Sequence, residues 1–69
     1  MTWEELKREA KKMGYDLIYD GIKEHLVKTD MIFTEGGTVE IVLDEKYNRH
    51  RLRMMRTPDQ MFAMMKALQ

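Results

Sequence analysis

The sequence predicts an α+β domain in which an antiparallel β-meander of about four strands lies between an N-terminal and a C-terminal helix. Three observations favour this fold. Apolar residues recur at helical spacing near both ends of the chain. Between the two ends the spacing changes to alternation, which is typical of strands. The dipeptides that separate the alternating segments form short turns, so consecutive strands must run antiparallel.

The expected first helix begins at a capping box. The Thr2 hydroxyl can accept a hydrogen bond from the Glu5 amide, while the Glu5 carboxylate reaches back to the Thr2 amide. Gly14 follows the last helical turn and predicts the end of the helix. One apolar stripe runs along this segment, at Trp3, Leu6, Ala10 and Met13.

The expected second helix begins with the same signal. Thr57 and Gln60 repeat the capping box, and Pro58 occupies the first helical position, where its missing N–H costs nothing. Its apolar face consists of Met61, Met64, Met65 and Leu68. We interpret these methionines as a core that fills irregular gaps rather than as an adaptable binding surface. Because each helix has one apolar stripe, both helices can pack on the same face of the sheet and leave the other face open.

Strands are expected near residues 15–20, 24–34, 38–43 and 50–56. Turns are expected at Asp20-Gly21 and Gly36-Gly37. The second strand is unusually long. Its Lys28-Thr29-Asp30 segment fits a bulge, a bend, or a turn that would divide it and make five strands.

The last strand contains a row of arginines. Strand side chains two positions apart share a face, so Arg49, Arg51 and Arg53 should line the open face. The alternate residues His50, Leu52 and Met54 should then face the helices. The expected covered-face pairs are Leu43 with His50, Ile41 with Leu52 and Val39 with Met54. The expected open-face pairs are Asp44 with Arg49, Val42 with Arg51 and Glu40 with Arg53.

The position of Phe33 depends on the turn at Gly36-Gly37. A two-residue loop would place Phe33 on the open face beside the arginines, whereas a three-residue loop would pair it with Val39 and bury it. We predict that the open face is an interaction surface, because arginine and aromatic residues are enriched at interfaces. The residues predicted for this surface are Arg49, Arg51, Arg53, Val42, Phe33 and Glu40.

Composition limits the chemistry that the chain can perform. The 69 residues form a single small domain (1–69) without cysteine, which excludes disulfides and thiolate metal sites. His50 fits a structural role, and His25 is the one histidine with the character of a general base. No nucleophile motif is present. We therefore expect no enzyme activity, no catalytic or metal-binding residues and no cofactor.

The chain has no apolar run long enough to span a membrane, and its acidic N-terminus shows no signal-peptide pattern. We expect a cytoplasmic protein with no membrane partner. Residues 1–48 carry a net charge of −4 and residues 49–69 carry +4. Because the total is zero, the two halves are expected to pair with each other rather than to attract an acidic partner. We predict a non-catalytic protein-interaction module or a small homo-oligomer that uses the open sheet face. The alternative is a nucleic-acid-binding accessory protein that acts through strand 49–56.

The order of helices and strands, together with the small size, is similar to that of HicA-type mRNA interferase toxins. In that family a glycine is followed closely by a catalytic histidine on an early strand. Gly21 and His25 stand in this relation here, although the adjacent Gly-Ser-His run is absent. The resemblance concerns layout, and it implies a small ribonuclease as a third hypothesis.

Overall fold

The computed structural model describes residues 1–42 and 51–69. Two helices and five strands make up this part of the chain, and the strands form one antiparallel sheet in the order β1-β2-β3-β4-β5. The helices are α1 (Trp3–Lys12) and α2 (Pro58–Ala67). The strands are β1 (Asp16–Tyr19), β2 (Glu24–Lys28), β3 (Met31–Thr34), β4 (Thr38–Val42) and β5 (Arg51–Met55). The predicted α+β meander is confirmed, with five strands instead of about four.

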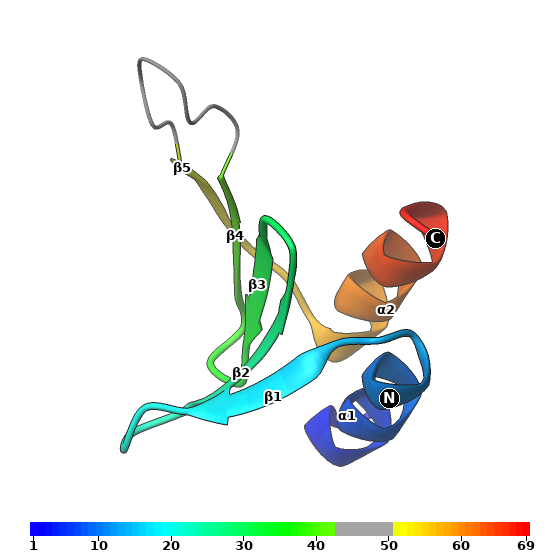
Figure 1. Cartoon of the computed structure of the whole chain (residues 1–69), viewed down its shortest axis with the longest axis horizontal. Helices are drawn as coiled ribbons and strands as arrows, with labels where there is room; N and C mark the ends of the chain where they lie inside the picture. The colour runs from blue at the N-terminus through cyan, green and yellow to red at the C-terminus, as the bar shows by residue number, and fades with distance from the viewer. Residues whose placement is uncertain (43–50) are drawn as a thin grey trace.

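Both helices lie on the same side of the sheet and contact each other, as predicted (Figure 1). Every strand is hydrogen-bonded to its neighbours in sequence. No helix within the described ranges 1–42 and 51–69 covers the opposite side of the sheet. In the same ranges, neither helix is long and apolar enough to cross a membrane.

Both predicted capping boxes are present. The Thr2 hydroxyl accepts from the Glu5 amide at 3.1 Å, and the Glu5 carboxylate accepts from the Thr2 amide at 2.8 Å. Thr57 and Gln60 make the equivalent pair of hydrogen bonds at 3.2 and 2.9 Å. These bonds satisfy amides that have no partner within the first turn of a helix. The two helices therefore begin where the sequence predicts.

The turn between β2 and β3 divides the long predicted strand. Lys28 pairs with Met31, which leaves Thr29 and Asp30 as a two-residue loop. Thr29 adopts a φ of +50°, a conformation that β-branched residues rarely adopt. A turn formed by these residues has no glycine signal in the sequence, so the sequence fits both four and five strands.

The turn between β3 and β4 decides the position of Phe33. The Gly37 amide donates to the Thr34 carbonyl at 2.9 Å, and Gly37 has a φ of +94°. The resulting register pairs Phe33 with Val39. Phe33 is fully buried and therefore lies in the core, not on the open face. A three-residue loop, rather than a two-residue loop, thus sets which side chains of β3 face the helices.

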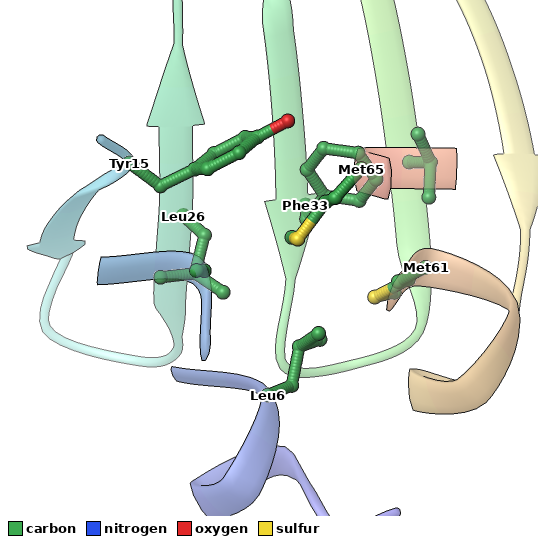
Figure 2. Close-up of a cluster of buried hydrophobic side chains, with 8 residues drawn as sticks. Leu6, Tyr15, Leu26, Phe33, Met61 and Met65 are labelled. Atoms are coloured by element: carbon green, nitrogen blue, oxygen red, sulfur yellow. The ribbon is translucent and has the colours of Figure 1, made fainter. Parts of the chain in front are cut away.

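The core lies between the sheet and the two helices (Figure 2). Phe33 is central to it, and the Tyr15 ring meets the Phe33 ring edge-on with a centroid separation of 5.6 Å. The remaining buried apolar side chains come from both helices and from β2 and β4, and they are Leu6, Ala10, Leu26, Val39, Met61 and Met65. The helix stripes predicted from the sequence supply half of this cluster. The two buried methionines of α2 fit the predicted core role.

The register of β4 and β5 agrees with the prediction. Val39 pairs with Met54 and Ile41 pairs with Leu52, on the covered face. On the open face Glu40 pairs with Arg53, and the backbone of Arg51 lies opposite Val42. The predicted pairs Leu43–His50 and Asp44–Arg49 lie outside the described residues.

Candidate functional site

The open face of the sheet is the side that faces away from α1 and α2. Strand alternation and the register assign its residues, because side chains two apart share a face. Its described side chains are Asp16, Ile18, His25, Val27, Ile32, Thr34, Thr38, Glu40, Val42, Arg53 and Met55. All five strands contribute at least one of them.

An apolar band crosses the middle of the open face. Val27 and Ile32 are directly opposite each other on β2 and β3, and both are half-buried. Ile18 on β1 is 50% exposed and Val42 on β4 is half-buried. No helix of the described ranges lies over these side chains. The register places Ile18 diagonally beside Val27 and Val42 diagonally beside Ile32, so the four side chains follow one another across the sheet.

Charged residues lie at the two ends of one row across this face. The register aligns Asp16, Val27, Ile32, Glu40 and Arg53 in that order. Arg53 Nη2 lies 3.8 Å from Glu40 Oε2, and the Arg53 side chain is 71% exposed. The row therefore has an acid on β1, an apolar centre, and an ion pair with an exposed guanidinium on β5.

The structure brings together three of the six predicted surface residues. Glu40, Val42 and Arg53 lie on the open face as predicted. Phe33 does not, because its pairing with Val39 turns it into the core. The backbone of Arg51 is opposite Val42, and Arg49 lies outside the described residues. Ile32, not Phe33, is the β3 side chain in the same row as Arg53, and Glu40 lies between them.

The side chains of Asp20, His25 and Thr34 form a hydrogen-bonded array on the open face, next to the β1–β2 turn. His25 Nε2 lies 2.6 Å from Asp20 Oδ2, and His25 Nδ1 lies 3.2 Å from the Thr34 hydroxyl. The second Asp20 oxygen accepts from the amides of Ile22 and Lys23, both at 2.9 Å. Hydrogen bonds from the Lys23 amide, the His25 ring and the Ile22 amide hold the pKa of the Asp20 carboxyl well below its usual range. Asp20 thus closes the β1–β2 turn and orients the imidazole.

The order of groups in this array is hydroxyl, imidazole, carboxylate. With Asp20 accepting from Nε2–H, the imidazole presents Nδ1 as an acceptor for the Thr34 hydroxyl, the arrangement that activates a nucleophile. However, Thr34 is only 6% exposed, so its hydroxyl has little room for a substrate. The array links the β1–β2 turn, β2 and β3, and this geometry favours a structural role. In residues 1–42 and 51–69, no three histidine or carboxylate side chains lie close enough to hold a metal ion.

Sequence reasoning missed the partners of His25 and most of the apolar band. His25 is opposite Thr34 only because the β2–β3 loop has two residues. Had the Thr29-Asp30 turn been assigned, counting along both strands would have paired these two side chains. The same count places Val27 opposite Ile32 on the open face.

Comparisons with protein families, with curated proteins and with solved structures find no significant match to this chain.

Proposed function

We propose that the protein is a non-catalytic interaction module whose open sheet face binds a second copy of the chain. The observation that carries this proposal is the apolar band of Ile18, Val27 and Ile32 on a face that no described helix covers. Small domains bury a limited fraction of their surface, and pairing two open faces would extend the core of each. Two sheets that pack face to face lie about 10 Å apart, with their side chains interdigitating.

The charges of the open face support a symmetric contact. A two-fold axis parallel to the strands, passing through the middle of the row, would reverse the row in the second copy. Asp16 of one copy would then face Arg53 of the other, and the apolar centres around Ile32 would meet. Such a contact is isologous, since the same patch serves both partners. Unlike charges at the two ends would fix the register, and like charges would oppose the alternative in which the row is not reversed.

The test is the molecular mass in solution, measured by light scattering over a range of concentrations. We expect a dimer for the natural sequence and a monomer for Ile32→Lys, because a charge would enter the apolar centre of the contact. Ile22→Lys is the matched control: Ile22 is 80% exposed in the β1–β2 turn, outside the open face. A natural protein that stays monomeric at high concentration would contradict the proposal.

A nucleic-acid partner is the alternative that the exposed Arg53 guanidinium favours. Binding that neutralises phosphates weakens steeply with salt, with a log–log slope of about −0.7 to −0.9 per contact. We expect weak salt dependence, because Glu40 already lies beside Arg53. Replacing both Arg51 and Arg53 by alanine should weaken self-association and leave the fold intact. If that variant loses binding to an oligonucleotide instead, the alternative replaces the dimer.

A nuclease is the third hypothesis, and it requires His25. We propose that His25 stabilises the turn and performs no catalysis, since both of its ring nitrogens are engaged by Asp20 and Thr34. His25→Ala should therefore leave any ribonuclease activity of a purified sample unchanged. Loss of that activity in a folded His25→Ala protein would support catalysis.

A further inference from the structure

The β1 edge of the sheet offers a second surface, separate from the open face. β1 lies at one end of the strand order, and all four of its residues are exposed. Leu17 is 52% exposed and Tyr19 is 65% exposed, on the side of the sheet that carries the helices. An exposed edge with apolar side chains is a template for pairing with another strand.

The backbone of β1 presents hydrogen-bonding groups at defined positions. The Asp20 amide donates to the Lys23 carbonyl at 3.2 Å, so the pair Asp20–Lys23 is of the hydrogen-bonded type. Antiparallel pairs alternate between hydrogen-bonded and non-hydrogen-bonded types. Leu17 and Tyr19 therefore belong to the non-hydrogen-bonded type, and their N–H and C=O groups point away from β2. An incoming strand would find these groups available.

A groove of about 350 Å³ lies beside this edge, between β1 and α1. Its apolar wall comes from Tyr15, Leu17 and Leu26. Its other wall is one face of α1, in which the lining residues follow helical spacing: Glu4, Lys7, Arg8 and Lys11. Side chains of a strand added to β1 would enter this groove at every second position.

The charge of the groove selects among partners. Lys7 is already engaged, because its ammonium lies 3.0 Å from Glu24 Oε1 and 3.1 Å from Glu4 Oε2. Arg8 and Lys11 are exposed, and neither forms an ion pair within the described part of the chain. Asp16 also borders the groove, but strand alternation assigns its side chain to the open face. The helical wall therefore presents two exposed cations that form no ion pair in the described ranges, of which Arg8 also attracts the Glu5 carboxylate at longer range.

We propose that this groove binds an extended acidic peptide, which adds to β1 as a sixth strand. The spacing of the cations fits such a peptide. Helix residues three apart, such as Arg8 and Lys11, are about 5–6 Å apart at Cβ. Strand side chains two apart are about 6.6 Å apart. Two carboxylates separated by one residue can thus meet Arg8 and Lys11, while an apolar side chain meets Leu17. Main-chain hydrogen bonds supply affinity and the alternate side chains supply specificity.

The test uses a capped nine-residue peptide with glutamate at positions 3 and 5, valine at position 7 and threonine elsewhere, so that both carboxylates and the apolar side chain share one face. In the control peptide lysine replaces both glutamates. Binding is followed by amide NMR shifts of the natural protein. We expect the largest shifts at Leu17 and Tyr19, from the glutamate peptide alone. Absence of binding, equal binding of both peptides, or shifts confined to the open face would overturn the proposal.

Charge reversal gives a second, independent measurement. Arg8→Glu combined with Lys11→Glu should weaken the glutamate peptide roughly tenfold and should allow the lysine peptide to bind. Lys12→Glu is the control for Lys11→Glu: it makes the same change of charge on α1 at a residue that does not line the groove. If the double variant does not fold, Lys11→Glu alone tests the same contact. Unchanged affinity in the folded variant would contradict the inference.

The inference is independent of the dimer proposed above. Ile32→Lys should abolish the dimer and leave binding of the glutamate peptide intact, since Ile32 lies on the opposite face from the groove. A second copy could also occupy the β1 edge. In that case Leu17→Pro, which removes an outward N–H at an edge position that tolerates proline, would dissociate the dimer, and the acidic peptide would be the wrong partner.

Discussion

The two faces of the sheet are built from the same strands yet differ in how their side chains are buried. On the covered face, Leu26, Phe33 and Val39 are almost completely inaccessible, because α1 and α2 pack over them. Their sequence neighbours on the open face, such as Val27 and Ile32, are only half-buried. Apolar character alone therefore does not make a core. Burial is supplied by the second layer, so identical residue types contribute to stability on one face and remain available for binding on the other.

Hydrogen bonds of polar side chains join different elements on the two faces of the sheet. On the covered side, the Glu24 carboxylate accepts hydrogen bonds from Lys7 and from the Trp3 indole, both at 3.0 Å. This cluster joins α1 to β2. On the open side, the array of Asp20, His25 and Thr34 joins strands to each other and to a turn. The first cluster holds two layers together, whereas the second reinforces a single layer.

The largest expected difference between the faces concerns adjacent residues of β3. Phe33→Ala should lower the free energy of unfolding by about 3–5 kcal/mol, because a fully buried ring leaves a cavity. Ile32→Ala should lower the free energy of unfolding by less than half as much, because the Ile32 side chain is already partly exposed to solvent. Urea denaturation of both variants measures the difference. A domain of this size has roughly 3–10 kcal/mol of total stability, so Phe33→Ala should be close to unfolded. Equal effects would mean that something also covers the open face in solution.

A smaller effect is expected within the open face. Thr34→Val should reduce the free energy of unfolding by about 1 kcal/mol, because the buried hydroxyl that bonds His25 Nδ1 is lost. NMR of the imidazole nitrogens should show a changed tautomer balance at the same time. Thr38→Val is the matched control, since the Thr38 hydroxyl is paired only with the Met55 sulfur in the described part of the chain. If the two variants are equally stable, the array does not reinforce the sheet.

The smallest expected effect is the response to acid, and it compares one carboxylate on each face. Hydrogen bonds from the Lys23 amide and His25 lower the pKa of Asp20, and hydrogen bonds from Lys7 and Trp3 lower the pKa of Glu24. A carboxyl whose pKa is lower in the folded state stabilises the fold when it is charged. Carboxyl groups of the unfolded chain have pKa values of about 4. The stabilisation is therefore complete above about pH 4–5 and is lost as the pH falls below that range.

Asp20→Asn and Glu24→Gln should therefore each make the unfolding free energy less dependent on pH between about pH 5 and 2. Thermal denaturation over this range measures the dependence. Asp30→Asn is the control, because the Asp30 side chain enters no hydrogen bond or ion pair among the described residues. An unchanged slope in either test variant would show that its carboxylate interacts equally in the unfolded chain.

Much of the fold could be predicted because its signals are local. The two capping boxes need only residues three apart, and the β4–β5 register follows from alternation combined with the charge pair of Glu40 and Arg53. Phe33 could not be placed, because a change of one residue in loop length exchanges the faces of a strand. The β2–β3 turn is not evident from the sequence, because Thr29 adopts a left-handed conformation at a position without glycine or asparagine.

The candidate surfaces were less predictable because they depend on distant pairings. His25 meets Thr34 only once the β2–β3 turn is known, and the groove beside Leu17 exists only once α1 is packed against the sheet. No periodicity within one segment encodes how a helix is positioned relative to a strand edge. The predicted arginine row was placed correctly at Arg53, since strand alternation suffices there.

The strand order has a consequence for how the chain folds during synthesis. Each strand pairs with the next one along the chain, so the meander can form progressively from local hairpins, a topology associated with rapid folding. The helix pair is different. α1 and α2 contact each other, but all five strands lie between them in sequence. Met61 and Met65 are core residues, and both belong to α2. The covered face of the nascent sheet therefore stays incompletely shielded until α2 has emerged from the ribosome, which is when the chain is most exposed to aggregation and to chaperones.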